Sequence, residues 1–336
     1  MNESTRLTTA LAAARVGWDQ VARCDAMAGG TFNSVYLVRL ADGTGLVVKI
    51  PPGPDTPLLR YEQSILATEA LYYRLAAQAD GVSLPSVLAV DPAGREYLVM
   101  TECPGSPWSQ LRPPPSGGER EELRAELGRR VARLHTITGP GFGYPSLALG
   151  PLRGTWREAF LGMVDAVLAD AAEYAVSLPR PAAEIAQLFS AQAAVLDEVT
   201  TPALVHYDLW DGNILVERGS AGDRMGALID AERAFWGDPL ADFVSLALFA
   251  DIEHDTAFLE GYRSAGGTVS FGFSTRRRLS LYTAYLYLIM WVEVIPRQGG
   301  PQRRDWLTGK VFRPLTAIFD QWSPRPGGEK SDEGFR

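Results

Sequence analysis

The stretch LVHYDLWDGNILV, residues 204–216, places three polar side chains between two apolar runs. His206 stands two positions before Asp208, and Asn213 follows Asp208 by five positions. The flanking runs have the composition of short β-strands, so the polar residues are expected on the loop that joins them. Taken alone, the pattern also fits a hydrogen-bonded core histidine with an aspartate and an asparagine that cap a turn. Other parts of the chain must decide between these interpretations.

Phosphoryl transfer is a chemistry that requires such a loop. Its transition state carries negative charge on phosphate oxygens, so a site must hold a divalent cation through hard oxygen ligands and place a carboxylate near the attacking hydroxyl. Asp208, Asn213 and Asp230 supply these groups, because Asp230 ends the next apolar run in ALIDAERAFWGDP. The spacing from Asp208 to Asn213, together with His206 and Leu209, equals that of the protein-kinase catalytic loop H-R-D-L-x-x-x-N.

The chain before this loop has the pattern of a small antiparallel sheet. Residues 4–16 and 58–78 have helical composition and spacing, and Asp42-Gly43 is a hairpin signal. After the Pro- and Gly-rich loop at 111–118 the chain is mostly helical. The predicted class is therefore α+β, with a five-stranded antiparallel sheet that carries one helix after its third strand. Alternating runs predict the strands near 21–28, 34–40, 45–50, 86–90 and 96–102.

Lys49 and Glu69 are charged residues in apolar settings. Lys49 interrupts the strand GLVVKI, which is also compatible with a lysine on a solvated strand face. Glu69 falls on the helical stripe of Ile65, Tyr72 and Ala76, so its side chain is expected to point at protein. A lysine on the third strand that pairs with a glutamate on the following helix is the kinase device that orients the α- and β-phosphates.

The turn between the first two strands, in AGGTFNSVYLV, is a candidate phosphate-binding loop. Gly29 and Gly30 open it, and backbone N–H groups there, with Asn33 or Ser34, are expected to cover phosphates. Two adjacent glycines are also common in ordinary hairpins, and the three spaced glycines of protein kinases are missing.

Composition limits the classes of partner. The chain has 336 residues, 46% hydrophobic and 21% charged, which fits a globular protein with one large two-lobed domain or two closely joined domains. A net charge of −8 does not favour nucleic acid or an anionic membrane, so a small molecule is the expected partner. Cys24 and Cys103 lack the spacing of a zinc site. No signal peptide or membrane span is visible, and we expect a cytoplasmic protein.

The ordered set of motifs resembles the aminoglycoside phosphotransferase family, relatives of choline and fructosamine kinases with a protein-kinase-like two-lobed fold. The resemblance covers roughly residues 20–250. Its motifs, in the family's order, are GGTFNSVYLV, LVVKI, the helix with Glu69, YLVMTECPG, LGRRVARLH, LVHYDLWDGNILV and LIDAERAFWGDPLADF.

The resemblance implies a role for each matching residue. Asp208 would be the catalytic base or the group that orients the hydroxyl. Asn213 and Asp230 would bind magnesium, and Lys49 with Glu69 would clamp the phosphates of ATP or GTP. The segment 100–103, with Thr101, Glu102 and Cys103, would meet the nucleotide base through backbone groups. The lobes are expected at 1–103 and 104–324, followed by a disordered tail at 325–336.

The acceptor is expected to be a hydroxyl of a small molecule, such as an antibiotic or a related natural product. The alternatives are a metabolic kinase of choline, fructosamine, sugars or nucleosides, and a nucleotide-binding pseudoenzyme. Eight basic residues between 270 and 315, against two acids, argue against a polycationic aminoglycoside, although the acids on the helix near 158–173 have the opposite sign. The candidate acceptor contacts are Glu232, Tyr282, Tyr285 and Trp291, of which the aromatic residues equally fit a core role.

Overall fold

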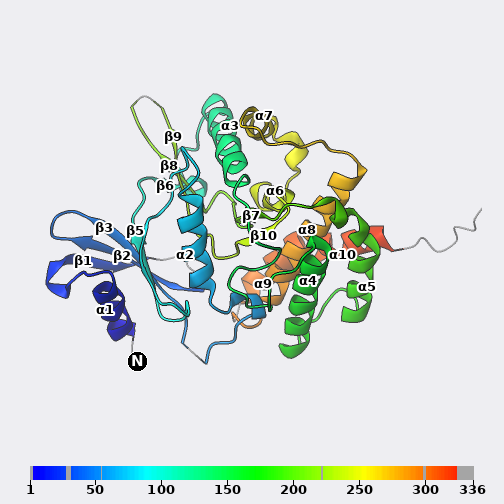
Figure 1. Ribbon diagram of the computed structural model, residues 1–336, viewed down its shortest axis with the longest axis horizontal. Helices are drawn as coiled ribbons and strands as arrows, with labels where there is room; N and C mark the ends of the chain where they lie inside the picture. The colour runs from blue at the N-terminus through cyan, green and yellow to red at the C-terminus, as the bar shows by residue number, and fades with distance from the viewer. Residues whose placement is uncertain (1–2, 28–31, 54, 221, 298–299, 324–336) are drawn as a thin grey trace, which may run out of the picture.

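The computed structural model describes residues 3–27, 32–53, 55–220, 222–297 and 300–323. Figure 1 shows a β-rich part on the left beside a larger, mainly helical part. The tail predicted to be disordered and the predicted loop glycines Gly29 and Gly30 lie outside the described residues. Within the described ranges, no helix combines the length and the apolar character needed to cross a bilayer.

The β-rich part is a five-stranded antiparallel sheet in the order β1-β2-β3-β5-β4. This confirms the predicted sheet, and each predicted strand is present with ends that shift by at most two residues. The strands are β1 (Val21–Ala26), β2 (Ser34–Leu40), β3 (Gly45–Ile50), β4 (Val87–Val90) and β5 (Leu98–Thr101).

Strand alternation gives the two faces of the sheet different tasks. On β3, Leu46, Val48 and Ile50 point to the outer face, where helix α1 (Glu3–Ala13) covers them with Leu7 and other apolar side chains. Lys49 points to the opposite face, toward helix α2 (Ile65–Ala76) and the helical part. The central strand therefore carries its one charged side chain on the face that looks into the cleft.

Helix α2 begins later than its sequence pattern predicts. Residues 58–62 include a short 3-10 helix, η2 (Arg60–Glu62), and the α-helix starts only after Ser64, which has a left-handed φ of 60°. The predicted inward stripe is confirmed, because Ile65, Glu69 and Tyr72 are all buried.

The helical part holds the remaining helices around a second set of short strands. Helices α3 and α7 lie side by side (Figure 1). Glycines at two positions permit their close approach, since a Cβ on Gly128 would stand 2.1 Å from Phe258 O and one on Gly261 would stand 1.9 Å from Ala125 O. The α-helices are α3 (Gly117–Leu134), α4 (Trp156–Glu173), α5 (Ala182–Gln192), α6 (Leu240–Leu246), α7 (Thr256–Ser264), α8 (Phe273–Val292), α9 (Pro301–Leu307) and α10 (Arg313–Trp322). The other helical turns are η1 (Trp18–Gln20), η3 (Trp108–Gln110), η4 (Ala193–Glu198), η5 (Ile252–His254) and η6 (Thr308–Phe312).

Two small sheets hold the opening motif. Strand β7 (Ala203–Val205) pairs antiparallel with β10 (Phe235–Gly237), and β8 (Ile214–Glu217) pairs with both β6 (Ser106–Pro107) and β9 (Arg224–Leu228). The polar loop 206–213 therefore joins two sheets, and the segment 229–234 returns beside it.

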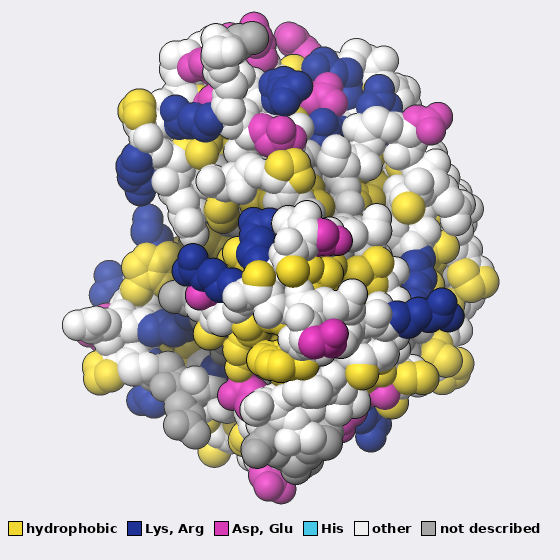
Figure 2. All heavy atoms as spheres, turned by 90° about the vertical axis from the view of Figure 1, so that its left-hand side faces the viewer, with side chains coloured by type: hydrophobic (Ala, Val, Ile, Leu, Met, Phe, Trp, Pro, Cys, Tyr) yellow, Lys and Arg dark blue, Asp and Glu magenta, His cyan; other side chains and the backbone are white. Residues whose placement is uncertain are grey.

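The hydrophobic core has two parts. The larger cluster unites α2 with the helices of the helical part, and the smaller one lies between α1 and the outer face of the sheet. Figure 2 looks at the molecule from the sheet side, and basic and acidic side chains are mixed over this face.

Candidate active site

The loop after β7 is held in a strained conformation by one buried carboxylate. Tyr207 has a φ of 62°, which is uncommon for a residue with a Cβ. Asp242, on α6, accepts hydrogen bonds from the N–H of Tyr207 at 2.6 Å and of His206 at 3.1 Å. His135, at the end of α3, contacts the other Asp242 oxygen at 2.9 Å. Asp242 thus buttresses the loop.

His206 is a buried, neutral residue that fixes the loop. Burial lowers the pKa of its imidazole, although the nearby carboxylates of Asp242 and Asp230 oppose the shift. The N–H of Asp208 donates to Nδ1 at 3.3 Å, so Nε2 carries the proton and donates to Ile229 O at 3.1 Å. His206 therefore links the loop to the segment that carries Asp230.

Asp208 stands at the centre of the polar loop. One carboxylate oxygen accepts a hydrogen bond from Asn213 Nδ2 at 3.1 Å, and the other lies 3.5 Å from Arg233 Nη1. Burial raises the pKa of Asp208 to about 6, against the opposing effect of Arg233. A carboxylate with this pKa is well suited to accept a proton near neutral pH.

Lys49 pairs with Glu69, as its sequence setting predicts, and it also contacts Asp230. Lys49 Nζ lies 2.7 Å from both Glu69 oxygens and 2.5 Å from Asp230 Oδ1. Burial alone would lower the pKa of Lys49, but the carboxylates of Asp230 and Glu69 outweigh it and raise that pKa. Tyr73 completes the group, since its hydroxyl donates to Glu69 and accepts from the N–H of Asp230 at 2.7 Å.

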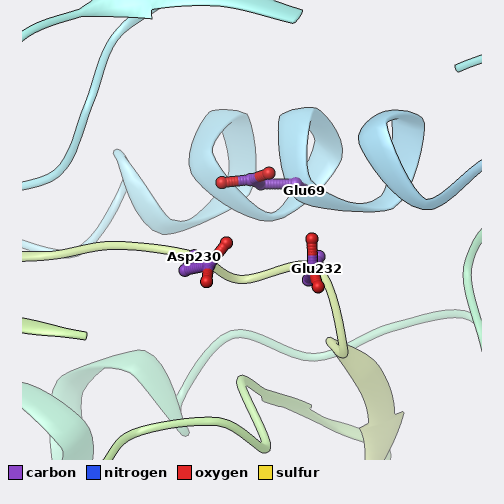
Figure 3. Close-up of side chains that lie close together, drawn as sticks. All are labelled: Glu69, Asp230 and Glu232. Carbon is purple, nitrogen blue, oxygen red and sulfur yellow. The ribbon is translucent and has the colours of Figure 1, made fainter. Parts of the chain in front are cut away.

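Figure 3 shows Glu69 on α2 facing Asp230 and Glu232 on the segment after β9. One oxygen from each lies within 4.8 Å of the others, a spacing that could hold a cation. The ammonium of Lys49 already serves as the cation for Glu69 and Asp230. The three carboxylates are therefore the surroundings of a lysine, and they do not by themselves define a metal centre.

Asn213 and Asp230 fit a magnesium ion by their donor chemistry. The buried Asn213 directs its Nδ2 to the backbone O and side chain of Asp208, which leaves its amide oxygen as the coordinating atom. Asp230, which has a φ of 66°, contacts Lys49 through Oδ1, so its second oxygen is the one that would bind the ion. An amide oxygen beside a carboxylate is a typical ligand pair for magnesium at a phosphate site.

Asn33 and Ser34, two predicted phosphate contacts, direct their side chains to opposite faces of the sheet. The amide of Asn33 points into the cleft, where it donates to Glu232 Oε2 at 2.9 Å. Ser34 instead lies on the outer face of β2, where its side chain hydrogen-bonds Glu3 of α1 and lowers the pKa of that carboxyl. The prediction that the Ser34 hydroxyl covers phosphates is therefore wrong, because strand alternation turns it away from the cleft.

The segment expected to meet a nucleotide base follows β5. Thr101 and Glu102 bond within the sheet, since the N–H of Glu102 donates to Gly45 O at 2.9 Å and its carboxylate holds Arg39 at 2.6 Å. Burial raises the pKa of the half-buried Cys103 thiol to about 11, which keeps it protonated at neutral pH.

Tyr282 and Tyr285, two predicted acceptor contacts, are core residues. Both are fully buried on α8. The Tyr282 hydroxyl donates to Asp238 Oδ2 at 2.7 Å, and the Tyr285 hydroxyl lies 3.0 Å from that of Tyr144. Their prediction as acceptor contacts is corrected, because neither side chain reaches an open surface. Trp291 is half-buried and donates to Ser177 O at 2.8 Å.

A cavity of about 720 Å³ adjoins the polar loop on the side of α3 and the α6–α7 connection. Trp210 and Asp211 of the loop line it, as does Ser245, whose hydroxyl accepts a hydrogen bond from the N–H of Leu209 at 2.9 Å. The indole of Trp210 lies against the loop itself, since a Cβ on Gly212 would stand 2.2 Å from the ring. The nearest lining residue in the sequence, Trp210, therefore stands two positions after Asp208.

Arg233 is the site residue that sequence reasoning missed. Its guanidinium is buried between Asp208 and Glu293, which it contacts at 3.0 Å. A signal was present, since an arginine directly before the apolar run AFWG, three positions after Asp230, has to be paired when that segment is buried.

Comparisons with known proteins agree on one family. A family model described as the phosphotransferase enzyme family matches residues 24–282. A search of curated proteins found no match to the chain.

Solved structures give the same result for the fold. The chain superposes on a protein provisionally assigned as a fructosamine-3-kinase from Thermobifida fusca, at a TM-score of 0.66, with 23% identity over 96% of this chain and 98% of that one. A macrolide 2'-phosphotransferase from Brachybacterium faecium gives a TM-score of 0.55 and 21% identity over 91% and 97% of the two chains. A ternary complex of streptomycin, ATP and APH(2")-IIa gives 0.59 and 16% over 95% and 99%. The chain thus has the protein-kinase-like fold of these proteins.

Proposed function

Because the chain belongs to the phosphotransferase enzyme family, we propose that it transfers the γ-phosphoryl group of a nucleoside triphosphate to a hydroxyl of a small molecule. The observation that carries the proposal is the convergence of the sheet part and the helical part at one site. The segment with Asp230, which His206 ties to the loop of Asp208 and Asn213, contacts the buried Lys49 that pairs with Glu69 of α2.

Each residue has a task in this reaction. Asp208 accepts a hydrogen bond from the attacking hydroxyl, orients it and takes its proton as the bond to phosphorus forms. Arg233 holds one Asp208 oxygen from behind, so the carboxylate keeps a fixed direction. Lys49, held by Glu69, donates to phosphate oxygens of the nucleotide and fixes their position.

Magnesium would be held by Asn213 and Asp230, and it would neutralise charge on the phosphate oxygens during transfer. The loop residue Asn33 is well placed to donate to the same phosphates if it leaves Glu232, its partner at 2.9 Å. ATP is the proposed donor, in keeping with the ATP of the similar streptomycin complex.

The acceptor is proposed to bind in the cavity that begins at Trp210. Four acidic residues and two arginines line it. The acids are Glu121, Asp211, Asp251 and Asp255, and the arginines are Arg120 and Arg124. Arg124 is already paired with Asp255 at 2.5 Å. An acidic cavity lined by an indole favours an acceptor that carries a protonated amine near its hydroxyl.

The basic residues between 270 and 315 weigh less against this choice than their number suggests. Four of the eight have carboxylate partners within the protein, so these four do not present free positive charge. These pairs are Arg276 with Glu253, Arg278 with Asp238, Arg297 with Glu62 and Arg303 with Glu293. An amine-bearing antibiotic is therefore the first candidate, and a fructosamine, which also carries an amine beside hydroxyls, is the second, supported by the likeness to the Thermobifida protein.

The test is nucleotide consumption by the purified protein against a panel of macrolides, aminoglycosides, fructosamines and uncharged nucleosides. We expect turnover with an amine-bearing compound and little with the uncharged ones. Asp208→Asn should lower that turnover by about a hundred- to ten-thousandfold while nucleotide binding persists. Trp210→Ala should raise the KM for the acceptor and leave that for ATP unchanged. Near-wild-type turnover of Asp208→Asn would refute the proposed role.

A further inference from the structure

Residues 58–62, here called the strap, leave the sheet lobe and lie on the helical part. The N–H of Arg60 donates to Asp170 of α4 at 3.0 Å, and its guanidinium contacts Asp170 and, at 2.8 Å, Glu173. The hydroxyl of Tyr174 donates to Leu58 O at 2.6 Å. Asp170 is almost fully buried, so this anchor is a built contact between the two parts of the chain.

The other end of the strap is held by Arg297, which follows α8. Its guanidinium binds Glu62, a buried carboxylate whose second oxygen accepts from the N–H of Leu59 at 2.8 Å. Arg297 also lies 3.3 Å from Glu293 and 5.1 Å from the centre of the Phe32 ring, beside Asn33. The strap, Glu293 and the ring of Phe32 therefore meet at one guanidinium.

The contact with Glu293 leads to the reacting groups. Glu293 Oε2 lies 3.0 Å from Arg233, and Arg233 lies 3.5 Å from Asp208. Charges alternate in sign along this line, from Glu62 through Arg297, Glu293 and Arg233 to Asp208, and the first four side chains are each 10% exposed or less. Removing one charge from such a buried line leaves its neighbours to find new partners.

We propose that Arg297 is a positioning residue for phosphoryl transfer, which orients Asp208 through Glu293 and Arg233 while it fixes the strap through Glu62. The assignment rests on the proposed function, because it takes Asp208 as the group that meets the acceptor hydroxyl. Without Arg297, the cations that contact Glu293 within the described residues are Arg233 and the more exposed Arg303. Arg233 is then drawn toward Glu293, and its longer contact with Asp208 weakens.

Arg60 provides a matched control. It anchors the same strap through two carboxylates of α4, Asp170 and Glu173, and neither of them belongs to the line that reaches Asp208. A purely structural role for Arg297 predicts that Arg60→Gln and Arg297→Gln have equal effects on activity at matched fractions of folded protein. A positioning role predicts different effects.

The first measurement is kcat and KM for ATP, with the best acceptor of the panel or, failing that, with water in basal ATP hydrolysis. We expect Arg297→Gln to lower kcat about ten- to a hundredfold with the KM for ATP within about threefold, the span for a misplaced catalytic group. Arg60→Gln should keep kcat within about twofold. Arg297→Lys, which retains the charge, should recover part of the loss and also serves if Arg297→Gln does not fold.

The second measurement does not depend on activity. Hydrogen exchange of residues 204–213 should accelerate in Arg297→Gln and remain as in the wild type in Arg60→Gln. Equal kcat values for the two variants, or unchanged exchange of the loop in Arg297→Gln, would overturn the positioning role. A wild type that consumes no ATP would refute the proposed function, and the exchange data would still decide whether Arg297 holds the loop.

Discussion

Lys49→Met is expected to separate stability from activity. The substitution removes the cation between Glu69 and Asp230, whose oxygens lie 2.7 Å and 2.5 Å from Nζ. The side chain of Glu69 is 0% exposed, so its carboxylate would remain in the core without its partner. Breaking a buried pair by removing one member costs about 3–5 kcal/mol of unfolding free energy.

The partner substitution is expected to cost less. In Glu69→Leu, Lys49 keeps Asp230 at 2.5 Å, and Asp230 is 37% exposed and can be solvated. The double variant Lys49→Met with Glu69→Leu should recover part of the loss, because no charge is then left unpaired between β3 and α2. Turnover should not recover in the double variant, since no apolar side chain can donate to phosphate oxygens.

Urea unfolding of the four proteins at one pH measures the coupling free energy. Lys310→Met, at an exposed position on the helical part, is the matched control and should change stability by no more than about 0.5 kcal/mol. Contacting groups couple by roughly 0.5 kcal/mol or more. Strictly additive single effects, or recovered turnover in the double variant, would refute the reasoning.

Three further predictions concern Asp208, its partner Arg233 and the metal ligand Asp230. Because burial raises the pKa of Asp208 to about 6 and the carboxylate form is needed, kcat/KM should fall about tenfold per pH unit below that value, and a profile flat down to pH 4.5 would contradict the assignment. Arg233→Gln should move this limb to higher pH, since the guanidinium lowers the pKa of Asp208. Asp230→Ala should abolish turnover and make the rise in Tm on adding nucleotide independent of magnesium, whereas a retained magnesium dependence would assign the ion to other ligands.

The parts of the site that the sequence predicts are those with local signals. The strands alternate over a few residues, and Lys49 and Glu69 interrupt patterns that are otherwise apolar, so both their elements and their inward direction follow from periodicity. Asp208 and Asn213 stand five positions apart within one loop. Each inference needed only a short window of the chain.

The parts that were not predicted depend on distant partners. Arg60 meets Asp170 across 110 positions, and Arg297 meets Glu62 across 235. A single sequence gives no register between such segments, so the strap was read as the start of α2. The prediction of Tyr282 and Tyr285 as acceptor contacts was wrong for a related reason. A buried aromatic residue of the core and an aromatic residue that lines a pocket have the same helical spacing.

The two-part core sets where the chain can be exchanged between relatives. Val99 of β5 packs with α1, whereas its neighbours Leu98 and Met100 belong to the larger cluster together with α2. A crossover at residue 103 would therefore cut through the larger cluster, even though the backbone there looks like a boundary between lobes. A crossover after Ile50 would carry α1 and β1–β3 as one block and keep all the buried residues of the larger cluster together, although it would separate Val99 from α1. For recombination, the transferable module of this chain is smaller than its sheet lobe.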